Sequence, residues 1–183
     1  MAVLVLGGAG YIGSHTVYAL CEAGREVVVV DNLETGHQEA VHEKAAFYQG
    51  DISDTAFLHH VLRRESIDGV IHFAAYSIVA ESMRNPLKYY ENNVCKTKKM
   101  LEVLLESGVQ DVVFSSTAAV YGEPNRVPIS EQDPTEPTNP YGATKLAMEQ
   151  MFRWVANTGN LRCVSVRYFN ACGAHQDGKI GEA

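Results

Sequence analysis

Short apolar runs alternate with longer amphipathic segments along most of the chain. The first run, Ala2 to Leu6, breaks into a glycine-rich turn, and a helical pattern of apolar residues then continues from Ile12 to Ala23. A second apolar run, Val27 to Val30, ends on Asp31. Continuous short runs predict strands buried on both faces, and the longer segment with a period near 3.6 residues predicts a helix.

The alternation continues downstream and predicts an α/β protein. Further strands are expected over 46–49, 68–73, 111–115 and 161–167, with helices over 54–64, 86–107 and 141–158. Residues 32–45 are expected to form a loop or a short helix. Six strands with helices between them predict a doubly wound parallel sheet of the Rossmann type.

Three glycines in the first turn point to a dinucleotide site. Gly7 would permit the tight turn, Gly10 would let backbone amides approach a pyrophosphate, and Gly13 would let the helix pack closely on the strand. The positive end of the following helix favours phosphate. Asp31 follows eighteen residues after Gly13, so we interpret the stretch as a coenzyme site; a turn that serves packing alone is the alternative.

Asp31 also selects among coenzymes. Its carboxylate can accept hydrogen bonds from the adenosine ribose and would repel a 2′-phosphate, and no Arg or Lys follows before Lys44, which favours NAD over NADP. Asp51 and Ile52, at the end of the third strand, lie where an adenine edge is expected. A helix N-cap is an equally supported interpretation of Asp51 and Ile52.

The connection after the fifth strand is unusually long. Residues 116–140 contain five of the six prolines and leave the carboxyl end of a strand, where open α/β sheets bind ligands. We therefore favour an active-site loop over an inert surface loop.

The segment that follows carries candidate catalytic residues. Asn139 is a good N-cap and Pro140 suits the first helical position. Tyr141 and Lys145 then head an inward-facing stripe, which continues through Met148, Phe152 and Val155. A buried ammonium one turn away should lower the pKa of the tyrosine from about 10 towards neutrality and make it a general base. Thr117 is placed to hydrogen-bond the sugar or alcohol hydroxyl from which this base would remove a proton. The alternative interpretation of Tyr141 and Lys145 is a helix pair in which the lysine snorkels to solvent.

Composition narrows the class of partner. The net charge is −7 without a Lys/Arg cluster, which argues against nucleic acid and anionic membrane. Four scattered cysteines, no histidine pair at metal spacing, no signal peptide and no apolar run of membrane length predict a cytoplasmic protein without a metal site.

Taken together, the motifs resemble the extended short-chain dehydrogenase/reductases, and within them the nucleotide-sugar 4-epimerases. The similarity covers essentially all 183 residues. It rests on the glycine turn 7–15, Asp31-Asn32-Leu33, 71–75, 86–90, Asn92-Asn93-Val94, 114–122, Tyr141 with Lys145, and 167–170.

The resemblance implies C4 epimerisation of UDP-glucose and UDP-galactose through a 4-keto sugar, with tightly held NAD. Tyr141 would be the base, Lys145 would contact the nicotinamide ribose, and Thr117 would occupy the Ser/Thr position of the family. Implied coenzyme contacts are Gly7, Gly10, Tyr11, Ile12, Gly13, Asp31, Asn32, Leu33, Asp51, Ile52, Phe73, Ala74, Ala75, Asn92, Ser115, Tyr141, Lys145 and Phe169. Implied substrate contacts are Thr117, Tyr141 and Asn170.

Some positions depart from the family pattern. Ser77 replaces a frequent lysine, and Leu6, Lys96 and Ala171 replace a threonine, a glycine and a proline. Two other functions are compatible with the dinucleotide motif. The first is a nucleotide-sugar 4,6-dehydratase, whose subfamily pattern after the fifth strand is Thr-Asp-Glu. This chain has Thr117-Ala118-Ala119, without the carboxylates that elimination needs, so epimerisation is favoured. The second is a non-catalytic NAD-binding domain.

The resemblance also predicts the domain organisation. Residues 1–170 would form the NAD-binding domain, and 171–183 would begin a substrate-binding lobe that is largely missing. The helices over 86–107 and 141–158 would pair subunits into a homodimer.

Overall fold

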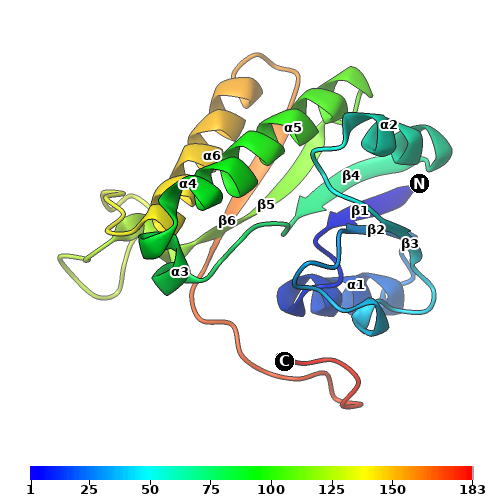
Figure 1. The fold of residues 1–183 in the computed structure, drawn as a ribbon, viewed down its shortest axis with the longest axis horizontal. Coiled ribbons are helices and arrows are strands. Elements are labelled where there is room, and N and C mark those ends of the chain that lie inside the picture. Colours follow the sequence, from blue (N-terminus) through cyan, green and yellow to red (C-terminus); the bar gives the residue numbers. More distant parts are fainter. Residues whose placement is uncertain (183) are drawn as a thin grey trace.

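Six parallel strands form a single sheet in the order β3-β2-β1-β4-β5-β6. The computed structural model describes residues 1–182 (Figure 1). The strands are β1 (Ala2–Leu6), β2 (Val27–Asp31), β3 (Ala46–Gln49), β4 (Ile67–His72), β5 (Asp111–Thr117) and β6 (Arg162–Tyr168). The doubly wound parallel sheet expected from the sequence is confirmed.

Helices lie on both faces of the sheet (Figure 1). They are α1 (Tyr11–Glu22), α2 (Thr55–Arg64), α3 (Val79–Arg84), α4 (Pro86–Tyr89), α5 (Lys96–Glu106) and α6 (Pro140–Ala156). Short 3₁₀ turns occupy Gln38–Ala40 and Ala118–Tyr121. Asp54 caps α2 by accepting a hydrogen bond from the Phe57 amide, which explains why this helix begins where the sequence predicted.

The predicted helix over 86–107 is helical throughout residues 86–106, but its hydrogen-bonding pattern is not uniform. A π-helical segment, Tyr90–Cys95, separates α4 from α5. Periodicity could not reveal it, because one wider turn shifts the apolar pattern by only one residue. The six-residue helix α3 was also not predicted, since it is too short to establish a period.

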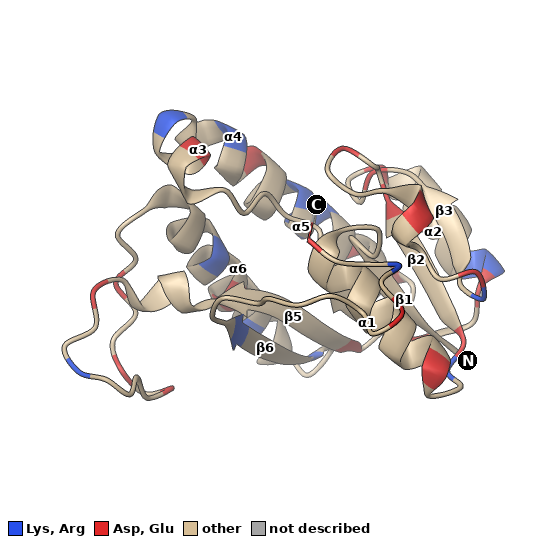
Figure 2. Ribbon diagram, turned by 90° about the horizontal axis from the view of Figure 1, so that it is seen from below, with Lys and Arg blue, Asp and Glu red and all other residues tan. Residues whose placement is uncertain are grey.

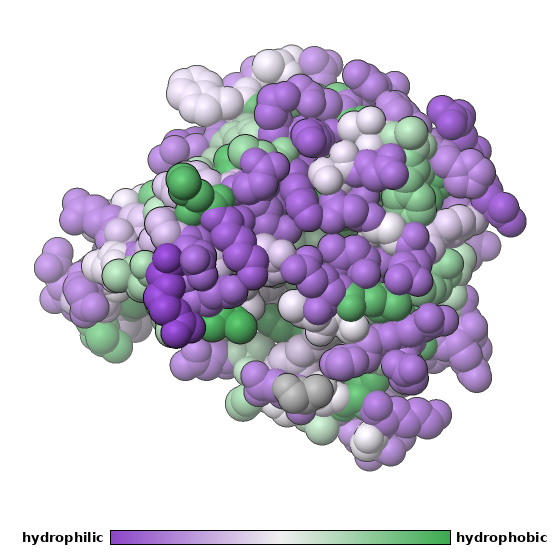
Figure 3. Space-filling model, in the orientation of Figure 1, coloured by the Kyte–Doolittle hydropathy of each residue, from purple (hydrophilic) through white to green (hydrophobic). Residues whose placement is uncertain are grey.

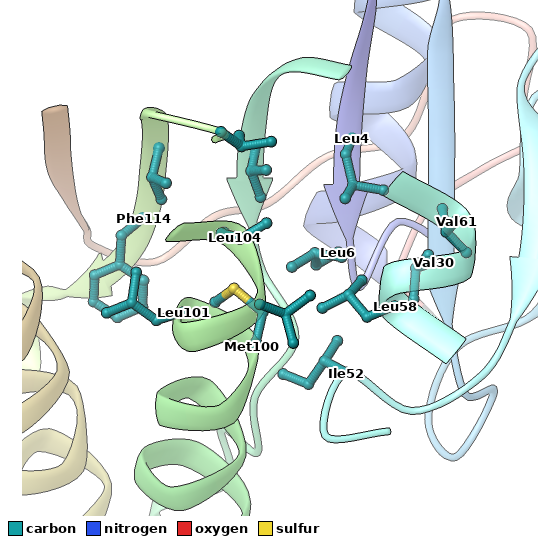
Figure 4. Close-up of a cluster of buried hydrophobic side chains, with 14 of the residues drawn as sticks. Leu4, Leu6, Val30, Ile52, Leu58, Val61, Met100, Leu101, Leu104 and Phe114 are labelled. Carbon is teal, nitrogen blue, oxygen red and sulfur yellow. The ribbon is translucent and has the colours of Figure 1, made fainter. Parts of the chain in front are cut away.

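Alternating side chains of the strands feed two cores. Leu4 and Leu6 of β1 pack with Leu58 and Leu104 on the face covered by α2 and α5, as Figure 4 shows for part of this cluster. Val5 points the other way, into a smaller cluster with α1. Successive strand residues point to opposite faces, so the fully apolar sequence of β1 places this strand at the centre of the sheet.

The surface is mixed in character. Acidic and basic residues are interspersed over the helices and loops (Figure 2), and apolar side chains form scattered patches between polar ones (Figure 3). Within residues 1–182, no helix combines the length and the apolar character needed to cross a bilayer.

Helix α6 offers a direct test of core packing. Phe152 is 1% exposed and stacks near Phe114, with ring centroids 5.1 Å apart, whereas Trp154 on the same helix is 69% exposed. We expect Phe152→Ala to lower the free energy of unfolding by about 3–5 kcal/mol, because it leaves a cavity in the main cluster.

The matched control is Trp154→Ala, for which we expect a change of about 0.5 kcal/mol or less in urea unfolding. Equal losses in both variants would contradict the assigned packing of α6.

Candidate active site

A cavity of about 620 Å³ opens at the carboxyl ends of the strands. The chain runs from β1 outwards to β2 and β3 on one side, then crosses to β4 on the other side. Loops that leave β1 and β4 therefore diverge and create a crevice, the usual ligand site of such sheets.

Most residues predicted from the sequence line this cavity. They are Gly7, Gly10, Tyr11, Ile12, Gly13, Asp31, Asn32, Asp51, Ile52, Phe73, Ala74, Ala75, Asn92, Ser115, Tyr141, Lys145, Phe169 and Asn170. Leu33 and Thr117 do not line it. Glu34, Thr35, Tyr76, Ser77, Lys96 and Glu182 also line the cavity.

The glycine turn is shaped by two close approaches. A β-carbon on Gly13 would lie 2.1 Å from the Gly7 carbonyl oxygen, and one on Gly7 would lie 2.6 Å from the Ala74 amide nitrogen. Gly7 also has a φ of +80°. These two glycines are therefore required by the fold itself.

Gly10 differs from its neighbours. A β-carbon there would meet only the Gly7 carbonyl oxygen, at 3.5 Å, and its backbone is extended with a φ of −79°. The space beside Gly10 belongs to the cavity, at the positive N-terminus of α1. The residues present thus fit a bound pyrophosphate, which would accept hydrogen bonds from amides of the first turn.

Asp31 at the end of β2 organises the next loop. Its carboxylate oxygens accept hydrogen bonds from the Ala9 amide at 3.0 Å and the Leu33 amide at 2.9 Å. Each carboxylate oxygen can accept two hydrogen bonds, so capacity remains for ribose hydroxyls.

Asp51 is not a helix cap, because Asp54 performs that role for α2. Lys96 donates to the Asp51 carboxylate at 2.6 Å, and the Ser53 amide donates at 2.8 Å. Burial opposes ionisation of Asp51, but these hydrogen bonds outweigh it and lower its pKa to about 2. The cap alternative is therefore wrong, and Lys96 places a cation beside the crevice.

The start of α6 brings the candidate catalytic residues together. Asn139 caps the helix by accepting a hydrogen bond from the Gly142 amide at 2.8 Å. Lys145, 3% exposed, donates to the Ser115 carbonyl at 2.8 Å and lies 5.0 Å from the centre of the Phe114 ring. An ammonium has three donors, so this contact leaves others for a ligand. Thr117 lies outside the cavity lining but close enough to Tyr141 to lower the pKa of that phenol.

The expected lowering of the Tyr141 pKa is wrong for the chain in this structure. Burial raises the pKa of Tyr141, and the nearby Thr117 side chain opposes the rise. Burial also lowers the pKa of Lys145 to about 7. The cation assumed from the sequence is therefore itself only marginally protonated near neutral pH, so it cannot dominate the tyrosine.

Buried polar residues behind the cavity hold its walls. Asn93 accepts a hydrogen bond from the Tyr76 amide at 2.8 Å and donates to the Thr144 hydroxyl at 3.1 Å. Ser82 accepts one from the Tyr141 amide at 3.2 Å. Apart from the asparagine pair, which lies in the unpredicted π-helical segment, no sequence pattern indicates these roles.

A Rossmann sheet with Tyr-x-x-x-Lys at the start of the helix after β5 defines a short-chain dehydrogenase/reductase. The model of the NAD dependent epimerase/dehydratase family matches residues 3–182, and the chain belongs to that family. The coenzyme of this family is NAD.

Known proteins of high similarity are UDP-glucose 4-epimerases. The enzyme of Lacticaseibacillus casei is 57% identical over 182 residues, which cover 100% of this chain and 55% of the relative. The crystal structure from Brucella ovis, in complex with NAD, superposes with a TM-score of 0.96 at 48% identity and covers 100% of this chain and 56% of that one. The structure from Bifidobacterium longum, in complex with NAD+ and UDP, gives 0.95 at 40% identity, with 100% and 57% covered. The chain spans about half the length of these relatives.

The geometry of Gly10 predicts that a substitution at this position weakens NAD binding without lowering the stability of the fold. We expect Gly10→Ala to fold normally, because its backbone suits alanine, and to weaken NAD binding by about tenfold or more, because the methyl group occupies the approach of the pyrophosphate. Thermal unfolding and NAD titration by calorimetry measure the two effects. Unchanged NAD affinity in the folded variant would contradict the placement of the pyrophosphate.

The buried Lys145 predicts a pH dependence of stability. Its pKa is about 7 in the folded chain and about 10.4 when unfolded. Between these values the unfolded chain binds more protons, so this group makes stability rise with pH.

Relative to Lys145→Met, we expect the wild-type free energy of unfolding to increase by about 2 kcal/mol from pH 7 to pH 9. Urea unfolding at both pH values provides the measurement, and parallel pH profiles of the two proteins would contradict the assignment.

Proposed function

We propose that this chain is the coenzyme-binding and catalytic portion of a UDP-glucose 4-epimerase. The observation that carries the proposal is that Tyr141 and Lys145 line the dinucleotide crevice, with Thr117 beside Tyr141. Support comes from the 57% identity to the Lacticaseibacillus casei enzyme over the whole chain.

In this proposal Tyr141 removes the proton from the sugar 4-hydroxyl, and Thr117 holds that hydroxyl and the phenol in line. NAD held in the crevice would supply the hydride acceptor for oxidation at C4 and the hydride donor for reduction of the 4-keto sugar, and Tyr141 would return its proton to the 4-oxygen. Lys145 binds the nicotinamide ribose with donors that Ser115 leaves free. Its positive charge, where present, favours the phenolate form of Tyr141.

The absence of a carboxylate after Thr117 favours epimerisation over dehydration. Elimination of water from a 4-keto sugar needs a further acid and base, and the 3₁₀ turn that follows begins with Ala118 and Ala119. These methyl side chains cannot transfer protons.

The remaining assignments extend the same proposal. Residues 1–170 form the NAD-binding domain, and 171–183 lead into the substrate-binding region, with Asn170 contacting the nucleotide sugar. We infer a cytoplasmic homodimer that pairs through the two helical segments 86–107 and 141–158. The four free cysteines are compatible with a reducing compartment.

A chimera tests this function. The 183-residue chain joined to the C-terminal half of the Lacticaseibacillus casei enzyme should convert UDP-galactose to UDP-glucose, whereas the chain alone should bind NAD with negligible turnover. Tyr141→Phe in the chimera should lower kcat by about 10²–10⁴-fold, because it removes general-base catalysis.

NAD content after denaturing extraction serves as the control and should be the same in both chimeras. Substantial turnover by the Tyr141→Phe chimera would refute the role of Tyr141, and robust turnover by the 183 residues alone would refute the need for the second half.

A further inference from the structure

A hydrogen bond joins the two loops that flank the crevice. The Tyr76 hydroxyl, in the loop after β4, donates to the Glu34 carboxylate, in the loop after β2, at 2.5 Å. Both residues line the cavity. Because β1 lies between β2 and β4 in the sheet, this bond crosses the end of β1, where the glycine turn provides the pyrophosphate position.

The loop that carries Tyr76 is firmly held. Buried Asn93 binds both its amide, at 2.8 Å, and its carbonyl oxygen, at 3.1 Å. Lys88 lies 4.5 Å from the centre of the Tyr76 ring, and the Tyr89 ring is 5.6 Å away. These contacts therefore fix both the backbone of Tyr76 and the orientation of its ring.

Glu34 lies at the top of an arch that is attached to the glycine turn at both ends. Asp31 accepts a hydrogen bond from the Ala9 amide at 3.0 Å, and the His37 amide donates to the Ala9 carbonyl at 3.0 Å. Between these points Glu34 is exposed to solvent. Tyr76 therefore contacts the segment at an exposed residue between two points that are attached to Ala9.

We propose that Tyr76 and Glu34 form a clasp over the dinucleotide and set the rate at which the coenzyme leaves the crevice. The inference rests on the coenzyme site of the proposed function and adds two retention residues to it. A reaction that returns the hydride to the same sugar requires the coenzyme to remain bound through both half-reactions, so slow release is useful to this enzyme.

The protonation state of the phenol suits this role. Burial, together with the hydrogen bond to Glu34, raises the pKa of Tyr76 to about 12. The phenol therefore remains a hydrogen-bond donor throughout the neutral range.

Coenzyme release tests the clasp directly. The 183-residue chain is loaded with NADH and mixed rapidly with excess NAD, and the loss of bound-NADH fluorescence gives the dissociation rate. We expect Tyr76→Phe to accelerate dissociation by about 10-fold or more, the effect of losing one hydrogen bond to a charged group, with the association rate changed less than about 2-fold.

Two further variants test whether Glu34 is the partner of Tyr76 and whether the effect is specific to the crevice. Glu34→Ala should accelerate release as much as Tyr76→Phe, and the double variant should add nothing, because both remove the same bond. Tyr48→Phe is the matched control. Its hydroxyl donates to Glu65 at 2.6 Å, and neither residue lines the cavity, so its dissociation rate should equal that of the wild type.

Three results would overturn the clasp. They are an unchanged rate in Tyr76→Phe, an equal acceleration in Tyr48→Phe, and a double variant whose effect is the product of the two single effects. A wild-type chain that binds no NADH would instead remove the coenzyme site on which the proposed function depends. Normal binding with unaltered release would leave that function standing and refute the clasp alone.

Discussion

The contact between Gly13 and the Gly7 carbonyl determines the rest of the site. Because α1 approaches β1 without an intervening side chain, its N-terminus lies directly above the strand end, where its amides face the crevice. The same closeness lets Asp31 reach the Ala9 amide. The strand order then supplies the opposite wall, since the loop after β4 passes the glycine turn at Ala74.

Different physics applies at the start of α6. Lys145 is buried against Phe114, and its only protein hydrogen bond among residues 1–182 is to the carbonyl of Ser115. The fold tolerates this desolvated amine at a cost in stability, as polar groups in a low-dielectric site usually require. Such strain is typical of groups that complete their contacts only when a ligand is bound. Tyr141 is in a similar state, with burial favouring its neutral form.

Sequence patterns predicted the elements well and the electrostatics poorly. Periodicity located all six strands, and the glycine spacing located the crevice, because both depend on local geometry. The predicted direction of the Tyr141 pKa shift was wrong, since burial of the phenol itself raises its pKa, and only packing determines that burial. Tyr76 and Lys96 were not assigned to the site, because their partners, Glu34 and Asp51, lie more than 40 residues away in the chain.

Asn93 in the π-helical segment connects the loop of Tyr76 to helix α6. Asn93 uses its full capacity of two donors and two acceptor positions, on the Tyr76 amide and carbonyl, Thr144 and Asn92. The peptide groups of Tyr76 permit only one orientation of this amide. A single saturated side chain thus acts as a fixed spacer between the coenzyme wall and helix α6. Leucine there would lose both connections, whereas aspartate could still accept from the Tyr76 amide but would lose the hydrogen bonds donated to the Tyr76 carbonyl and to Thr144.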